Sequence, residues 1–343
     1  MISLRVSSPL ILGIFLLLGS GCVVFRPVGD VITDGYQNTV AYFNSYYNAK
    51  NIFDAAEDEV LANEKTVRAR DGISDKPISI PQGARTKLVT VIDKCSNILS
   101  FHPESAYVDD AVFLIGKSYF YQADYLKAER KFAELLVLQI PPDFTLEAKL
   151  WLVRTMERLN EDEEALAETE QLIAEAKEQG EEELAGNASF VAGTLYSKAD
   201  NHERAVAFFL EATRTSDEEI IGAIAQYRVG EEYMSMKSYR EAAQAFLNVA
   251  EFSQEEGPLQ SSRLKAIAAF REAGDHERAL AVGSEAKDDY RFVNALQSVE
   301  FEEALTLNAK GDVPEAIAVL TVIDTTSPKT VLGCKAAFEL ARI

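Results

Sequence analysis

The sequence contains few of the residues from which metal sites and disulfide scaffolds are built. It has 3 cysteines, 3 histidines and 1 tryptophan in 343 residues. Two thiols beyond residue 22 are too few for a disulfide scaffold, so we expect Cys95 and Cys334 to be small buried hydrophobic residues. His202 and His276 occupy the same place in a repeated turn, which indicates a packing role. The sequence therefore predicts no metal site.

Basic residues are also scarce. There are 34 lysines and arginines against 55 aspartates and glutamates, which gives a net charge of -21. A polyanion of this size is repelled by phosphate backbones and by anionic lipid surfaces. The chain also lacks a phosphate-cradling glycine loop, a zinc HExxH motif and a nucleophile elbow. We therefore expect no enzymatic activity, no cofactor, no nucleic-acid partner and no small-molecule substrate.

The N-terminus has the pattern of an export signal. Arg5 precedes an apolar run at 10–18, and the small residues at 19–21 lead into Cys22. The apolar run is too short for a membrane span, so residues 1–21 are predicted to be a signal peptide. Cys22 resembles the modified cysteine of a bacterial lipobox, which predicts a lipidated N-terminus and linker at 22–35. Gly19 stands where a lipobox prefers leucine, so cleavage by ordinary signal peptidase is the alternative.

A repeat runs through most of the chain. Six segments share a turn followed by an alanine, with spacings of 37, 40, 37, 37 and 37 residues. Twelve positions before each alanine stands a small or apolar residue, and in three repeats a phenylalanine follows four positions after it. The alanines are Ala128, Ala165, Ala205, Ala242, Ala279 and Ala316.

This arrangement resembles the tetratricopeptide (TPR) repeat, a helix-turn-helix in which small residues permit close approach and aromatic rings fill the space. The resemblance implies an all-α fold, a right-handed α-solenoid of TPR helical hairpins. Residues 104–343 are expected to form six repeats and a partial seventh. The first helix of each hairpin is expected to line a concave groove.

Residues 36–103 are expected to form an aromatic helix, a loop and the first helical hairpin. Pro103 stands at the place where a TPR hairpin ends, which puts Cys95 at a buried aromatic position. The preceding helix carries an aromatic stripe. Its rings either pack on Val91, Cys95 and the next hairpin, or form a protein-contact surface. The candidate interface residues are Tyr36, Phe43, Tyr46, Tyr47 and Phe53.

Several cations fall at positions that would face the groove. They lie one or five residues after the small residue of the first helix in three neighbouring repeats. In so acidic a chain, such cations could hold a peptide carboxylate or an acidic tail. The alternative is that they form ordinary ion pairs with Glu129, Glu147 or Glu157. The candidate groove residues are Lys117, Tyr121, Arg154, Arg158 and Lys198.

The stretch NTVAYFNSYYNAKNIFDAAEDEV, followed by HPESAYVDDAVFLIGKSYFYQADYLKAERKF, resembles the N-terminal part of TPR lipoproteins of the Bacteroidetes–Chlorobi lineage. These include the SprE/PorW lipoproteins of gliding and type IX secretion. The resemblance implies a periplasm-facing scaffold, lipid-anchored in the outer membrane, that binds other proteins of a secretion or gliding complex. The HPESAYVDDA element is shared with BamD-like lipoproteins of barrel assembly, which is the alternative function. A SusD-like glycan-binding lipoprotein is a third alternative, but it should carry exposed tryptophans, whereas Trp151 lies inside a repeat.

Overall fold

The computed structural model describes residues 45–73, 78–138, 141–215 and 219–343. Cys22, Tyr36 and Phe43 lie outside these ranges. Every regular element within them is helical, and none of the described helices is both long and apolar enough to cross a membrane. The α-helices are α2 (Tyr47–Asp71), α3 (Gln82–Phe101), α4 (Val108–Tyr121), α5 (Tyr125–Val137), α6 (Pro142–Leu159), α7 (Asp162–Gln179), α8 (Glu182–Lys198), α9 (His202–Thr215), α10 (Glu219–Ser235), α11 (Tyr239–Asn248), α12 (Glu256–Glu272), α13 (His276–Asp288), α14 (Leu296–Lys310), α15 (Val313–Thr326) and α16 (Val331–Arg342).

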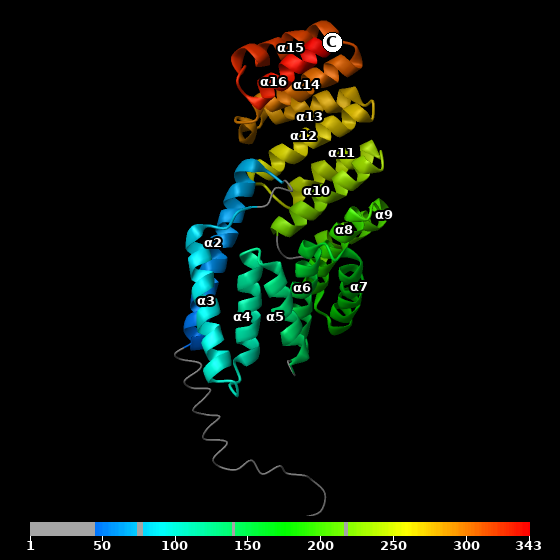
Figure 1. Ribbon diagram of the computed structural model, residues 1–343. Helices are drawn as coiled ribbons and strands as arrows, with labels where there is room; N and C mark the ends of the chain where they lie inside the picture. The colour runs from blue at the N-terminus through cyan, green and yellow to red at the C-terminus, as the bar shows by residue number, and fades with distance from the viewer. Residues whose placement is uncertain (1–44, 74–77, 139–140, 216–218) are drawn as a thin grey trace, which may run out of the picture.

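The helices stack as successive antiparallel hairpins, which confirms the TPR solenoid (Figure 1). Each even-numbered helix from α2 to α14 is the first helix of a hairpin, and each odd-numbered helix from α3 to α15 is the second. First helices contact the first helices of neighbouring hairpins, whereas successive second helices do not reach comparable contact in the described part of the chain. The first helices therefore form the inner layer of the solenoid, on the concave side of its curvature. Helix α16 packs on α14 and α15 as the first helix of the partial seventh repeat.

The turn within each hairpin has the same conformation in all six repeats. The residue five positions before the repeat alanine adopts a left-handed backbone, with φ between 53° and 100°. Glycine fills this position in only the last two repeats, and the non-glycine residues of the other four pay a steric cost there. The six residues are Ala123, Asn160, Asp200, Lys237, Gly274 and Gly311.

The hairpin cores follow the small-to-large pairing expected from the repeat. Phe132, Phe209 and Phe246 are fully or almost fully buried. A Cβ placed on Gly116, Gly193 or Gly230 would lie 2.6–2.7 Å from a carbon of the corresponding ring. The fifth repeat exchanges the two sizes, because Ile267 takes the glycine position and Gly283 takes the aromatic one. A Cβ added to Gly283 would meet the Glu303 side chain of the next hairpin at 2.8 Å, so in this repeat a side chain of α14 closes over the glycine.

The two cysteines differ. Cys95 is fully buried beside Val91 and Leu88, as expected from its place in the first hairpin. Burial raises the pKa of its thiol to about 12, with a smaller contribution from Asp110. The expectation that Cys334 is buried was wrong: it is exposed on α16. Gly333 and Ala336 make the buried contacts of this helix instead, so its cysteine faces outward.

Helix α2 closes the inner layer into a ring. Its N-terminal half packs on α3 and α4, and its C-terminal end contacts α12, the first helix of the fifth repeat (Figure 1). Ile73 is 5% exposed in the core around α12, and its amide donates to the Ser261 hydroxyl at 3.3 Å. The first helices from α2 to α12 thus contact one another in sequence, and the last contacts the first.

Candidate functional site

The inner faces of α4 and α6 carry a cluster of cations and aromatic rings. The Lys117 ammonium on α4 lies 4.8 Å from the ring centre of Trp151 and 4.9 Å from that of Phe53. It is paired with the Glu57 carboxylate of α2 at 2.9 Å, and its side chain is only 12% exposed. Lys117 therefore joins three first helices.

Tyr121 completes the contact between α2 and α4. Its hydroxyl donates to the same oxygen of Glu57 at 2.7 Å. Burial raises the pKa of the Tyr121 phenol well above its usual value, and the neighbouring Glu57 carboxylate adds to the shift. One carboxylate thus receives both the ammonium and the phenol, so Glu57 occupies a position that a bound carboxylate could otherwise take.

Trp151 is the centre of the aromatic part of the cluster. Its ring packs edge-on against Phe120 at 5.1 Å and against Tyr121 at 5.8 Å between ring centres, and it is 7% exposed. The Arg154 guanidinium lies 5.3 Å from the Trp151 ring centre on the same helix. This geometry is favourable for a cation–π contact, which keeps the guanidinium at the surface of the cluster.

Arg158 follows one helical turn after Arg154. Its side chain is 59% exposed, and its Nε lies 3.3 Å from a Glu157 carboxylate oxygen. Lys198 on α8 contacts the other Glu157 oxygen at 2.8 Å and Asp162 at 3.2 Å. Burial would lower the pKa of Lys198, but the Glu157 and Asp162 carboxylates reverse this, so the pKa is raised.

The structure therefore brings three of the five candidate groove residues, Lys117, Tyr121 and Arg154, close to Glu57 or Trp151. The other two, Arg158 and Lys198, share the Glu157 carboxylate. The alternative prediction, that these cations form ion pairs within the chain, is confirmed for Arg158 and Lys198, which both pair with Glu157. Lys117 also forms an ion pair, but with Glu57, which was not among the predicted carboxylates. Sequence reasoning missed Glu57. Its only signal was the acidic DAAEDEV segment, which follows the aromatic stripe on α2.

The aromatic candidates on α2 have different environments. Phe53 is 2% exposed between α2 and α4. Tyr46 stacks on Tyr107 with 4.8 Å between ring centres, and burial together with Asp110 raises the pKa of its phenol. Tyr47 is 49% exposed. Phe53 and Tyr46 therefore pack on the next hairpin, and Tyr47 faces solvent.

One polar cluster superficially resembles a catalytic triad. Ser197 donates to one oxygen of the buried Glu232 at 2.6 Å, and the Nδ1 of His202 lies 2.7 Å from the other oxygen. A triad requires the imidazole between hydroxyl and carboxylate, so that it can take the hydroxyl proton. Here the carboxylate stands between the other two. The arrangement holds α8, α9 and α10 together and does not activate Ser197.

A shallow apolar pocket of about 650 Å³ lies between α14 and α16. Phe301 and Phe338 line it and stand 37 residues apart, at equivalent repeat positions. Phe301 is 7% exposed, whereas Phe338 is 63% exposed. The last described first helix thus exposes a side chain at a position that is buried or half-buried in the six repeats before it. Within the described ranges, we find no group of three or more His, Cys, Asp or Glu side chains arranged to hold a metal ion.

No protein-family model matches the chain, and no curated protein matches it significantly. Among solved structures it is similar to the C-terminal part of a TPR repeat-containing protein from Cytophaga hutchinsonii. The identity is 12% and the TM-score 0.54, over 83% of this chain and 98% of the other. It is also similar to a STAND signal-transduction ATPase with a TPR sensor from Pyrococcus horikoshii. There the identity is 13% and the TM-score 0.52, over 90% of this chain and 48% of that one. At these identities, the likeness shows that the chain has the TPR solenoid fold.

Proposed function

We propose that this protein is a non-enzymatic scaffold that binds a partner protein on the inner face of its solenoid, around Trp151, Arg154 and Arg158. The observation that carries the proposal is the pair of guanidiniums beside the almost fully buried Trp151 ring. An aromatic ring lies under one guanidinium, and a second guanidinium is more than half exposed one turn away. Tryptophan and arginine are the residues most enriched at the energetic centres of protein interfaces.

The expected ligand group is a carboxylate of the partner. Lys117 and Lys198 already contact carboxylates of this chain at 2.9 Å and 2.8 Å. The Arg158 guanidinium is the most exposed of the groove cations whose ion pairs are described, and a guanidinium can bind a carboxylate through two parallel hydrogen bonds. An acidic side chain or a C-terminus of the partner therefore fits this place.

The cellular setting is part of the proposal. A lipid on Cys22 would anchor the chain in the outer membrane, facing the periplasm, and the aromatic helix α2 would follow that anchor after a short linker. The lipoprotein resemblance favours a component of a secretion or gliding complex. A BamD-like role in β-barrel assembly is the second candidate, because HPESAYVDDA is shared with that group.

Affinity capture from host membranes tests the binding surface. The tagged protein and its Arg154→Glu/Arg158→Glu variant are extracted from the host, and the co-purified proteins are quantified by mass spectrometry. We expect the wild type to enrich one set of envelope proteins and the variant to lose it, because two guanidiniums become carboxylates. Secretion or gliding components in that set would support the first role, and a barrel-insertion protein the second.

Arg204→Glu is the matched control. Arg204 lies on α9, an outer second helix, is also 59% exposed, and is also 3.3 Å from a glutamate oxygen. We expect this variant to retain the partner set. Equal loss from both variants would mean that general charge, and not the inner face, governs binding. Equal melting temperatures of all three proteins would exclude misfolding as the cause.

A further inference from the structure

The C-terminal part of α2 projects beyond the hairpin to which the helix belongs. Ala49, Phe53, Ala56 and Val60 are buried in the N-terminal half. From residue 61 to residue 71 no side chain is buried, and burial resumes only at Gly72 and Ile73. We call residues 61–73 the strap. Its side chains at 61–71 are exposed or half-buried, and its fully buried residues lie at the tip, just after the helix ends at Asp71. Within the strap, Asn63 donates to the Ser79 carbonyl oxygen at 3.2 Å.

The tip of the strap meets α12 backbone to backbone. A Cβ on Gly257 would lie 2.1 Å from the Arg68 carbonyl oxygen and 2.6 Å from that of Ala69. Both atoms belong to the backbone of α2, so no side-chain rotation could relieve the overlap. The contact therefore requires glycine at position 257. An exposed ion pair between Lys65 and Glu255, 3.7 Å apart, lies at the same junction.

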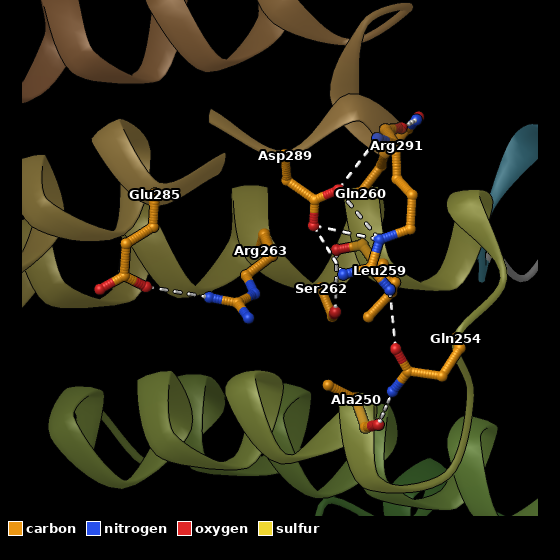
Figure 2. Close-up of polar contacts among 9 residues, drawn as sticks. All are labelled: Ala250, Gln254, Leu259, Gln260, Ser262, Arg263, Glu285, Asp289 and Arg291. Carbon is orange, nitrogen blue, oxygen red and sulfur yellow. Dashed lines mark hydrogen bonds and ion pairs between the residues drawn. The ribbon is translucent and has the colours of Figure 1, made fainter. Parts of the chain in front are cut away.

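The N-terminal end of α12, which receives the strap, is held by a separate polar network (Figure 2). The Gln260 side chain donates to the Arg291 carbonyl oxygen, and Arg291 donates to Gln254 at 2.7 Å. Arg291 also pairs with Asp289 at 2.6 Å. These contacts come from the segments on either side of α12 and α13, and none of them involves a strap residue.

We propose that the strap docks reversibly on α12 and controls access to the inner face of the solenoid. A segment with few buried apolar contacts opens at a lower free energy than the packed core. The strap has this character, and its undocking breaks the ring of first helices at one junction. The opened ring admits the partner segment to the cluster around Trp151. This last step rests on the proposed binding function, whereas the docking does not.

The Gly257→Ala variant of the full chain tests the strap. Alanine favours helix, so α12 itself should not be weakened, and only the approach of α2 is blocked. Three measurements follow the strap. A zero-length carbodiimide cross-link between Lys65 and Glu255 reports docking, hydrogen exchange reports the order of residues 61–73, and acrylamide quenching of the single tryptophan reports access to the inner face.

We expect the variant to lose the cross-link and to exchange about tenfold faster over 61–73, with 47–60 unchanged, because an unpacked helix end frays. Quenching of Trp151 should increase. Gly83→Ala is the control, since its added methyl would meet only the flexible end of Glu59. It should keep the cross-link. Ile73→Ala removes the buried side chain of the tip and should change all three signals in the same direction as Gly257→Ala.

Three results would overturn the inference. A cross-link and exchange pattern like the wild type would mean that the Gly257 contact does not hold the strap. If hydrogen exchange in the Gly257→Ala variant rose together over residues 47–73 and over α3, the strap would not open independently of the rest of α2. An undocked strap with unchanged Trp151 quenching would refute the control of access. The Arg154→Glu/Arg158→Glu variant separates the two proposals. It should lose partner capture but keep the Lys65–Glu255 cross-link, because the substitutions change the binding surface and leave the strap docked.

Discussion

Alanine in place of Gly230 tests the packing rule that organises the repeats. The added Cβ would lie 2.6 Å from a ring carbon of Phe246, a side chain with no exposed surface. Ordinary carbon contacts lie at about 3.5–4.0 Å, so the ring would have to withdraw by about 1 Å. Overpacking of this kind costs about 1–3 kcal/mol, and the better helix propensity of alanine returns up to about 1 kcal/mol. We expect a net loss of about 1–2 kcal/mol.

Urea denaturation followed by circular dichroism measures this loss, and hydrogen exchange of α10 and α11 shows that it is local. A second substitution, Phe246→Leu, should destabilise the Gly230→Ala variant less than it destabilises the wild type, because the smaller side chain relieves the overlap. Gly83→Ala is again the control. The reasoning would be refuted if Gly230→Ala were as stable as the wild type, or if the two substitutions added without coupling.

Three further predictions follow from single positions. Lys237→Gly should stabilise the chain by up to about 1 kcal/mol in thermal or urea unfolding, because Lys237 has φ 59° in a turn where two other repeats use glycine; a loss of stability would contradict this. Cys334 should react with iodoacetamide in the native chain while Cys95 does not, because Cys334 is exposed and burial raises the pKa of Cys95 to about 12; equal labelling would contradict the described burial. Arg291 lowers the pKa of Asp289 below its ordinary value, so the ionised carboxylate stabilises the fold above about pH 4 and this contribution is lost as pH falls through the lowered pKa. The difference in melting temperature between the wild type and Asp289→Asn should therefore shrink below about pH 4, and a constant difference would exclude ionisation as its cause.

The repeat explains why much of the fold could be predicted. Six copies of one pattern reveal which positions tolerate only a small or a large residue, so the Gly230–Phe246 contact and the burial of Cys95 followed from spacing alone. The left-handed turn residues are equally periodic, but no single residue type marks them. Gly274 and Gly311 are typical of a left-handed turn, but Lys237 and Ala123, which adopt the same conformation, are not. The sequence of the earlier repeats therefore did not predict it.

Contacts outside the repeat could not be predicted in this way. The Ile73–Ser261 hydrogen bond joins residues 188 positions apart, and no local pattern encodes which helix the end of α2 meets. The partner of Lys117 was missed for a related reason, because Glu57 lies before the first complete repeat. The error at Cys334 came from applying the average burial of cysteine to a residue on the outward face of α16.

Site-specific photo-cross-linking in the native host tests the central claim most directly. A photoreactive residue replaces either Ser235, an exposed residue of the inner helix α10, or Gln244, an exposed residue of the outer helix α11 in the same repeat. Binding on the inner face predicts an adduct with one envelope protein from Ser235 and none from Gln244. It also predicts that the Ser235 adduct is lost in the Arg154→Glu/Arg158→Glu background. Adducts from Gln244 alone would contradict the inner-face account and assign partner binding to the outer helices.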